Sequence, residues 1–226
     1  MSLAVNSHLA APNQGSFNIE AYLERINYHG SLAVTSETLR ALQQAHLLTV
    51  PFENLSIHAG EEIVLADQAL FAKIVERRRG GFCYELNGLF TALLRALGFE
   101  VAMLSAAVVN AAGELGPDFD HMTLLVTLAE RWLVDVGFGE SFREPLLVDA
   151  RTEQIQGDRL TGSLRTKRTW YLNNVLLKRY GKRSIVSLCN RSSIPTLAGC
   201  AFTIKPRQSL TSLKGAFARE PPRKAG

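Results

Sequence analysis

The sequence has few cysteines and lacks any long uninterrupted apolar run. Only Cys83, Cys189 and Cys200 are cysteines among 226 residues. An odd and small number argues against a disulfide framework and for a reducing compartment, so we expect a cytoplasmic protein. The longest apolar stretch, ALLRALGFEVAMLSAAVV, is interrupted by Arg95 and Glu100, so we expect no membrane span. The N-terminus lacks a charged segment followed by an apolar core, so we expect no signal peptide.

Histidine and cysteine are not spaced as metal ligands. Cys189 and Cys200 have neither a nearby histidine nor a CxxC partner. The sequence therefore predicts no metal site.

Acidic residues almost disappear from the last part of the chain. Residues 1–162 contain 11 basic and 20 acidic residues, whereas residues 163–226 contain 14 basic residues and one acidic residue. A basic segment of this kind is often a nucleic-acid-binding tail. This one has little aromatic interleaving and no binding motif, so we expect no nucleic-acid partner.

The hydrophobic pattern changes along the chain. A helical period occupies residues 18–30, 36–49, 67–81 and 83–98. Strand-like runs without that period follow at residues 99–109, 121–128 and 131–139. Helices followed by strands indicate an α+β fold.

Cys83 lies at or just before the first turn of the fourth expected helix. Unpaired N–H groups and the helix dipole favour a thiolate at such a position. Gly80 and Gly81 allow the backbone to approach a neighbour closely. The alternative is that Cys83 is a small buried hydrophobe.

A nucleophilic cysteine needs a base and a group that orients the base. His121 begins a strand-like run directly after the polar turn GPDFD, a usual place for a functional side chain. Asp135 is an acid inside an otherwise apolar run, and a buried carboxylate should have a partner. A short turn separates the two runs, so they should pair antiparallel. Asp135 could then hold the imidazole tautomer that accepts the thiol proton.

Four segments resemble one known family. RGGFCYELN is similar to the active-site signature of the arylamine N-acetyltransferases, and VPFENLSIH, DHMTLLV and VDVGFG are similar to three further segments in the same order and spacing. The resemblance covers about residues 17–160. It implies a catalytic triad of Cys83, His121 and Asp135. It also implies a ping-pong reaction, in which acetyl-CoA donates an acetyl group that passes to an arylamine or arylhydrazine without a metal.

The resemblance also implies supporting residues. Glu53 and Arg79 match family positions that pair near the cysteine, and would tie the PFEN loop to the Cys83 loop. Phe52 and Phe138 match aromatic positions that line the acceptor pocket. Without the resemblance, the two charges would be interpreted as solvated surface groups and the two rings as core packing.

The family has a helical bundle, an antiparallel β-barrel and an α/β lid. We expect residues 1–98 to form the bundle carrying Cys83. Residues 99–163 should form a barrel segment carrying His121 and Asp135. Residues 164–226 should be an atypical basic region, in place of the remaining barrel and an absent or scrambled lid.

The resemblance ends near residue 160, where the charge also changes. Two later segments, SIVSLCNR and SLTSLKGAFA, give family-like segments when suitable codons are read in a shifted frame. This favours the hypothesis of a frameshift near residues 160–180, which would reduce activity. Two alternatives stay open: a macrolactam-forming amide synthase of the same superfamily, and a non-catalytic remnant.

Overall fold

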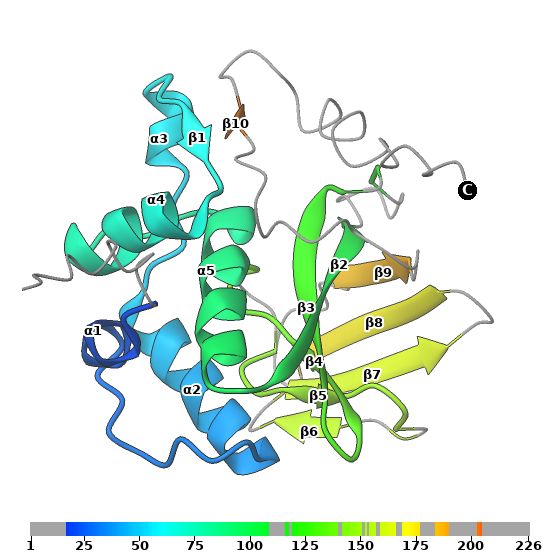
Figure 1. The fold of residues 1–226 in the computed structure, drawn as a ribbon. Helices are drawn as coiled ribbons and strands as arrows, with labels where there is room; N and C mark the ends of the chain where they lie inside the picture. Colours follow the sequence, from blue (N-terminus) through cyan, green and yellow to red (C-terminus); the bar gives the residue numbers. More distant parts are fainter. Residues whose placement is uncertain are drawn as a thin grey trace, which may run out of the picture.

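The structure is a computed structural model of the chain. It describes residues 17–108, 116–117, 119–139, 142–150, 152, 154–156, 159–165, 169–176, 184–189 and 203–204. Helices come first and an antiparallel sheet follows them, as Figure 1 shows. The α+β class predicted from the sequence is therefore confirmed.

The helical part contains the four expected helices, but the first, expected over residues 18–30, ends already at Arg25, the third is divided, and one short helix is additional. Its elements are α1 (Ile19–Arg25), α2 (Ser36–Thr49), α3 (Leu55–His58), α4 (Asp67–Phe71), the π-helix η1 (Ala72–Glu76) and α5 (Cys83–Ala96). The third expected helix is divided between α4 and η1, because the Arg77 N–H bonds the carbonyl of Ala72, five residues back, at 3.0 Å. The single turn α3 has no periodic signal and was not predicted.

Within the described part of the chain, the strands form one large sheet and one small one. The strands are β1 (Ile63–Val64), β2 (Glu100–Val108), β3 (His121–Thr127), β4 (Arg131–Val134), β5 (Leu146–Leu147), β6 (Gln154–Gln156), β7 (Arg159–Arg165), β8 (Thr169–Leu176), β9 (Ser184–Cys189) and β10 (Thr203–Ile204). Eight strands follow the order β5-β4-β3-β2-β9-β8-β7-β6, and β1 pairs with β10. In the described residues β5 and β6 are separate edges, so the sheet is open and does not show the expected barrel.

The large sheet continues beyond the stretch that carries the motifs. The expected boundary at residue 163 falls inside β7, and β8 and β9 extend the sheet back to β2. Apart from β10, the remainder of the expected basic region, including SLTSLKGAFA, lies outside the described residues.

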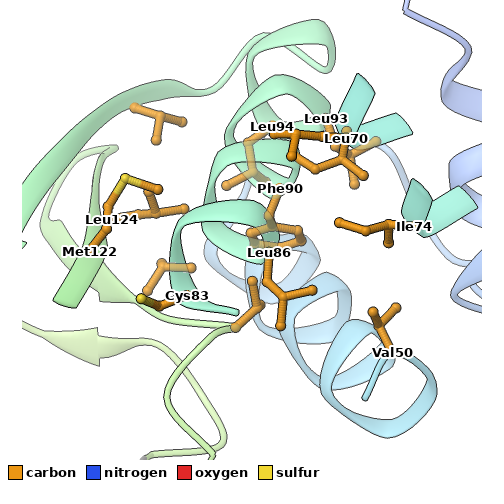
Figure 2. Close-up of a cluster of buried hydrophobic side chains, with 14 of the residues drawn as sticks. Val50, Leu70, Ile74, Cys83, Leu86, Phe90, Leu93, Leu94, Met122 and Leu124 are labelled. Carbon is orange, nitrogen blue, oxygen red and sulfur yellow. The ribbon is translucent and has the colours of Figure 1, made fainter. Parts of the chain in front are cut away.

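Helix α5 lies at the centre of the main core, between the other helices and the sheet (Figure 2). Its apolar positions recur every three or four residues, and Leu86, Leu89, Phe90, Leu93 and Leu94 are all fully buried. Truncating one fully buried leucine typically costs about 2–5 kcal/mol of stability. The start of this helix is therefore held by the best-packed part of the protein.

Two faces of the sheet are buried against different clusters. Residues of β3 alternate, and Met122, Leu124 and Val126 pack on the core around α5. Leu125 packs on the second cluster, which comprises Leu104, Ala106, Leu133, Phe142, Leu146 and Val148.

A polar group is buried within the helical part. His46 on α2 is fully buried, and its Nδ1 lies 2.8 Å from the hydroxyl of Tyr22 on α1. Burial first, and the nearby Arg25 charge second, lower the pKa of His46 from 6.5 to about 3. The neutral ring is thus the form that the fold accommodates.

His46 should make the protein sensitive to mild acid. The unfolded chain takes up a proton here near pH 6.5, whereas the folded protein takes it up only near pH 3. Stability therefore falls as the pH drops below 6.5, by roughly 2 kcal/mol between pH 6.5 and 5. Urea unfolding should show that a His46→Gln variant loses roughly 2 kcal/mol less stability than the wild type over the same pH interval. The exposed His29→Gln change should follow the wild-type pH dependence, and equal slopes for all three proteins would contradict the assignment.

Candidate active site

Cys83 is the first residue of α5 and has a free thiol. The preceding Phe82 is extended, with φ −92° and ψ 179°, and acts as the N-cap. The side chain is buried, with 6% exposure. The thiol therefore sits where the helix N-terminus presents unpaired N–H groups.

The loop before Cys83 is fixed by close backbone packing. A Cβ atom at Gly80 would lie 2.0 Å from the carbonyl oxygen of Pro51, so only glycine fits there. Gly81 accepts a hydrogen bond of 2.9 Å from the Glu53 N–H and forms a parallel bridge with Phe52. The PFEN loop is thus attached to the loop that leads to Cys83.

The sheet register brings His121 and Asp135 together. His121 begins β3, Asp135 directly follows β4, and Leu124 pairs with Val134. Extending this antiparallel register makes His121 and Asp135 diagonal neighbours on one face, within reach of each other. Their Nε2 and Oδ2 atoms lie 2.6 Å apart, and both residues are buried.

The Cys83 side chain lies close enough to the imidazole of His121 to help raise the pKa of that ring. The three residues predicted from the sequence are therefore in contact as a Cys–His–Asp chain. This places a base beside the thiol and an acid behind the base.

The charge on His121 is strongly favoured by its partners. Burial alone lowers the pKa of the ring, because desolvation disfavours the cation. The Asp135 charge, its hydrogen bond and the neighbouring Cys83 outweigh burial and raise the pKa to about 10. An imidazolium at neutral pH can stabilise a thiolate on Cys83.

Asn87 is a site residue that sequence reasoning missed. It lies one turn after Cys83 on α5 and is fully buried. Its Nδ2 donates to Asp135 Oδ1 at 3.0 Å and to the carbonyl of Met122 at 2.7 Å, and its Oδ1 accepts from the Val136 N–H at 3.0 Å. The available signal was an amide on an otherwise apolar face of the helix.

The VGFG turn closes the site from the sheet side. The Gly137 N–H donates to Asp135 Oδ1 at 2.8 Å. A Cβ atom at Gly137 would lie 2.7 Å from the Cα of Cys83, so glycine permits this close approach. The Phe138 ring meets the His121 ring edge-on, with centroids 4.8 Å apart.

The structure pairs the two charges that the resemblance pointed to. Arg79 Nη2 lies 2.9 Å from Glu53 Oε1, and Glu53 Oε2 accepts from the Leu55 N–H at 2.7 Å. The pair therefore connects the PFEN loop to the Cys83 loop. Phe52 on the same loop is 51% exposed, so its ring is not core packing.

Two negative findings concern the described residues alone. No group of three or more histidine, cysteine, aspartate or glutamate side chains there could hold a metal ion. None of the helices in the same part of the chain has the length and apolarity that crossing a membrane requires.

Asn87 should be needed to keep the site assembled. Asn87→Ala would leave the Val136 N–H and the Met122 carbonyl unsatisfied in the core, because no other side chain replaces the amide. We expect a loss of about 2–4 kcal/mol in the free energy of unfolding, measured with urea. The matched change Thr91→Val, one turn further along α5, removes one side-chain hydrogen bond to a helical carbonyl. It should cost about 1 kcal/mol, and equal losses would contradict the bridging role of Asn87.

Comparison with known proteins agrees with this geometry. The N-acetyltransferase family matches residues 35–217, which extends beyond the stretch that carries the motifs. The chain is 36% identical to arylamine N-acetyltransferase 2 of Mus musculus over 168 residues, covering 72% of this chain and 58% of the relative. It is 47% identical to the arylamine N-acetyltransferase of Escherichia coli over 119 residues, covering 52% of this chain and 42% of the relative.

Solved structures show the same likeness. The arylamine N-acetyltransferase of Mycobacterium marinum in complex with CoA aligns with a TM-score of 0.71 and 31% identity, covering 80% of this chain and 68% of the other. The chain spans less than two thirds of the length of the mouse and E. coli relatives. With the family match, the relatives and the shared fold in agreement, the chain belongs to the arylamine N-acetyltransferase family.

Proposed function

We propose that this chain transfers an acetyl group from acetyl-CoA to an arylamine or arylhydrazine through a thioester on Cys83. The observation that supports this most is the contact of Cys83, His121 and Asp135 at the start of α5. The M. marinum relative whose structure contains CoA supports acetyl-CoA as the donor.

The first half-reaction loads the enzyme. The Cys83 thiol gives its proton to His121, and the thiolate attacks the carbonyl carbon of the acetyl group. The first N–H groups of α5, which have no intrahelical acceptor, can stabilise the oxyanion that forms. The bond to the CoA sulfur then breaks, and the imidazolium returns its proton to the departing CoA thiolate.

The second half-reaction transfers the acetyl group. The amine nitrogen attacks the thioester carbonyl while the neutral imidazole of His121 accepts its proton. The C–N bond forms, the C–S bond breaks, and the proton returns to the Cys83 sulfur. Asp135 keeps its negative charge throughout and stabilises the imidazolium in both halves.

We propose that Phe52 and Phe138 form the wall that receives the aromatic acceptor. The ring of Phe138 touches His121, and Phe52 lies on the loop bridged to Gly81, so both belong to segments that border Cys83. A flat aromatic amine can stack or pack edge-on against such rings. The Glu53–Arg79 pair would hold the PFEN loop in place for this contact.

We also propose the division of the chain into a helical unit at residues 1–98, a barrel segment at 99–163 and an atypical basic region at 164–226. The sheet that crosses residue 163 favours a longer sheet-forming segment than the sequence suggested. A frameshift near residues 160–180 stays a hypothesis that the nucleotide sequence of the gene would test. We further propose a cytoplasmic location, because the chain has few cysteines.

Acetyl transfer should depend on one sulfur atom. With acetyl-CoA and an aromatic hydrazine, we expect wild type to release CoA and form the acetylated hydrazine, and Cys83→Ala to lose at least about 10³-fold in kcat/KM. Cys200→Ala is the matched control and should keep its activity.

Other outcomes of this assay would contradict the proposal. Full activity of Cys83→Ala would exclude the thioester. A wild type that fails with acetyl-CoA but uses a carrier-bound acyl thioester would favour the amide synthase, and failure with every donor would favour a non-catalytic remnant.

The thiolate should depend on Asp135. Without the carboxylate, His121 loses the partner that raises its pKa and accepts the thiol proton less readily. We expect Asp135→Asn to slow iodoacetamide labelling of Cys83 at pH 7 by about 10–100-fold, followed by mass spectrometry. Asp149→Asn, in a surface pair with Arg131, should label at the wild-type rate. Equal rates for all three proteins would show that Cys83 is not activated by this chain of residues.

A further inference from the structure

A buried ion pair lies against the first turn of α5, outside the Cys–His–Asp chain. Lys73 Nζ on η1 lies 2.7 Å from Glu85 Oε1 and 2.9 Å from Glu85 Oε2. Both residues are buried, with exposures of 7% and 3%. Burying two charges is costly, and replacing a buried ion pair with an apolar pair of the same size often leaves the protein equally stable. Its position therefore suggests a role besides stability.

Glu85 is attached to the loop that positions the nucleophile. It is two residues after Cys83, and its Oε2 accepts a hydrogen bond of 3.2 Å from the Phe82 N–H at the N-cap. A Cβ atom at Gly81 would lie 2.9 Å from the same oxygen, so the loop backbone packs directly on the carboxylate. Glutamate at this position is a recurrent helix-capping group. The carboxylate thus fixes the backbone on the N-terminal side of Cys83.

The carboxylate also brings a charge that opposes the chemistry. A thiolate on Cys83 and the oxyanion that follows are both negative, and Glu85 is in the same helical turn. An unbalanced negative charge in the first turn of α5 disfavours the ionised sulfur. Lys73 compensates it, so the cap is kept without the repulsion.

Lys73 is held in place by the fold. The π-helix η1 displaces the chain by one residue relative to an α-helix, and such turns occur often at functional sites. Arg25 from α1 donates to the Ile74 carbonyl at 2.8 Å and to the Arg78 carbonyl at 3.4 Å, on either side of the end of η1. Lys73 therefore meets Glu85 from a fixed backbone.

We propose that Lys73 is a positioning residue for Cys83, which neutralises the Glu85 cap so that the first turn of α5 can hold an anionic sulfur. The proposal rests on the proposed function, in which that sulfur is the nucleophile.

Other charged and titratable groups surround the pair and the sulfur. Tyr84 and His121 interact with the Cys83 sulfur, and Asp120 and Asp135 are the acids beside those two side chains. Those that line a cavity of ≈ 480 Å³ together with the pair are Glu61, Glu62, Arg77 and Arg79. The two glutamates and two arginines of the cavity cancel in charge. Removing one charge of the Lys73–Glu85 pair should therefore dominate the change in the local electrostatic field.

The test is the pH midpoint of Cys83 labelling by iodoacetamide, measured by mass spectrometry in four variants. Lys73→Met leaves the Glu85 charge unbalanced and should raise the midpoint by about one pH unit, a tenfold loss of thiolate at a given pH. Glu85→Gln keeps a capping side chain but leaves the positive charge of Lys73 unbalanced, so it should lower the midpoint. The double variant should return to the wild-type value. Arg40→Met removes a cation from a surface pair with Glu144 and should not shift it.

A purely structural role gives a different pattern. Both single variants would then lose stability in urea without opposite shifts of the labelling midpoint. Opposite shifts with restoration in the double variant support the proposal, and any other pattern overturns it. If Lys73→Met does not fold, the Glu85→Gln variant alone decides. A labelling midpoint for that variant at or above the wild-type midpoint overturns the proposal. Labelling needs no acetyl-CoA, so failure of acetyl transfer in wild type would refute the proposed function without deciding this experiment.

Discussion

The carboxylate of Asp135 joins the helical part of the protein to the sheet. One oxygen faces His121 at the start of β3, and the other accepts from Asn87 on α5 and from the Gly137 backbone. A buried carboxylate is stable only when such donors surround it. Three elements therefore converge on two oxygen atoms, and this convergence puts the start of α5 against the imidazole.

The start of α5 combines groups that would conflict if they were isolated. A helix N-terminus favours negative charge, and three groups that can be negative, Cys83, Glu85 and Asp135, lie at or near it. Each has a partner of the opposite charge or a hydrogen-bond donor, with His121 between Cys83 and Asp135, and Lys73 on Glu85. The well-packed apolar face of the same helix holds these charges in position, since it resists displacement of the first turn.

Sequence reasoning identified those site residues whose type is unusual for their position in the expected helix or strand. A cysteine after two glycines, a histidine at a strand start and an acid within an apolar strand each conflict with simple packing, so each suggested chemistry. Asn87 and Lys73 were missed because an amide or a lysine within a helical pattern is ordinary on a solvated face. Only the tertiary structure shows that Asn87 is fully buried and that Lys73 is nearly so.

The local pattern by itself determined the helices, because a period of 3.6 residues records which face of a helix is buried. It also determined the three strands around His121 and Asp135, and the residue types that make a Cys–His–Asp chain possible. Tertiary structure alone decided that α4 gives way to a π-helix, that Asn87 bridges α5 to Asp135, and that β7, β8 and β9 extend the sheet back to β2. Each of these depends on a partner far away in the chain, and a local sequence pattern shows that a segment can pair without showing what it pairs with.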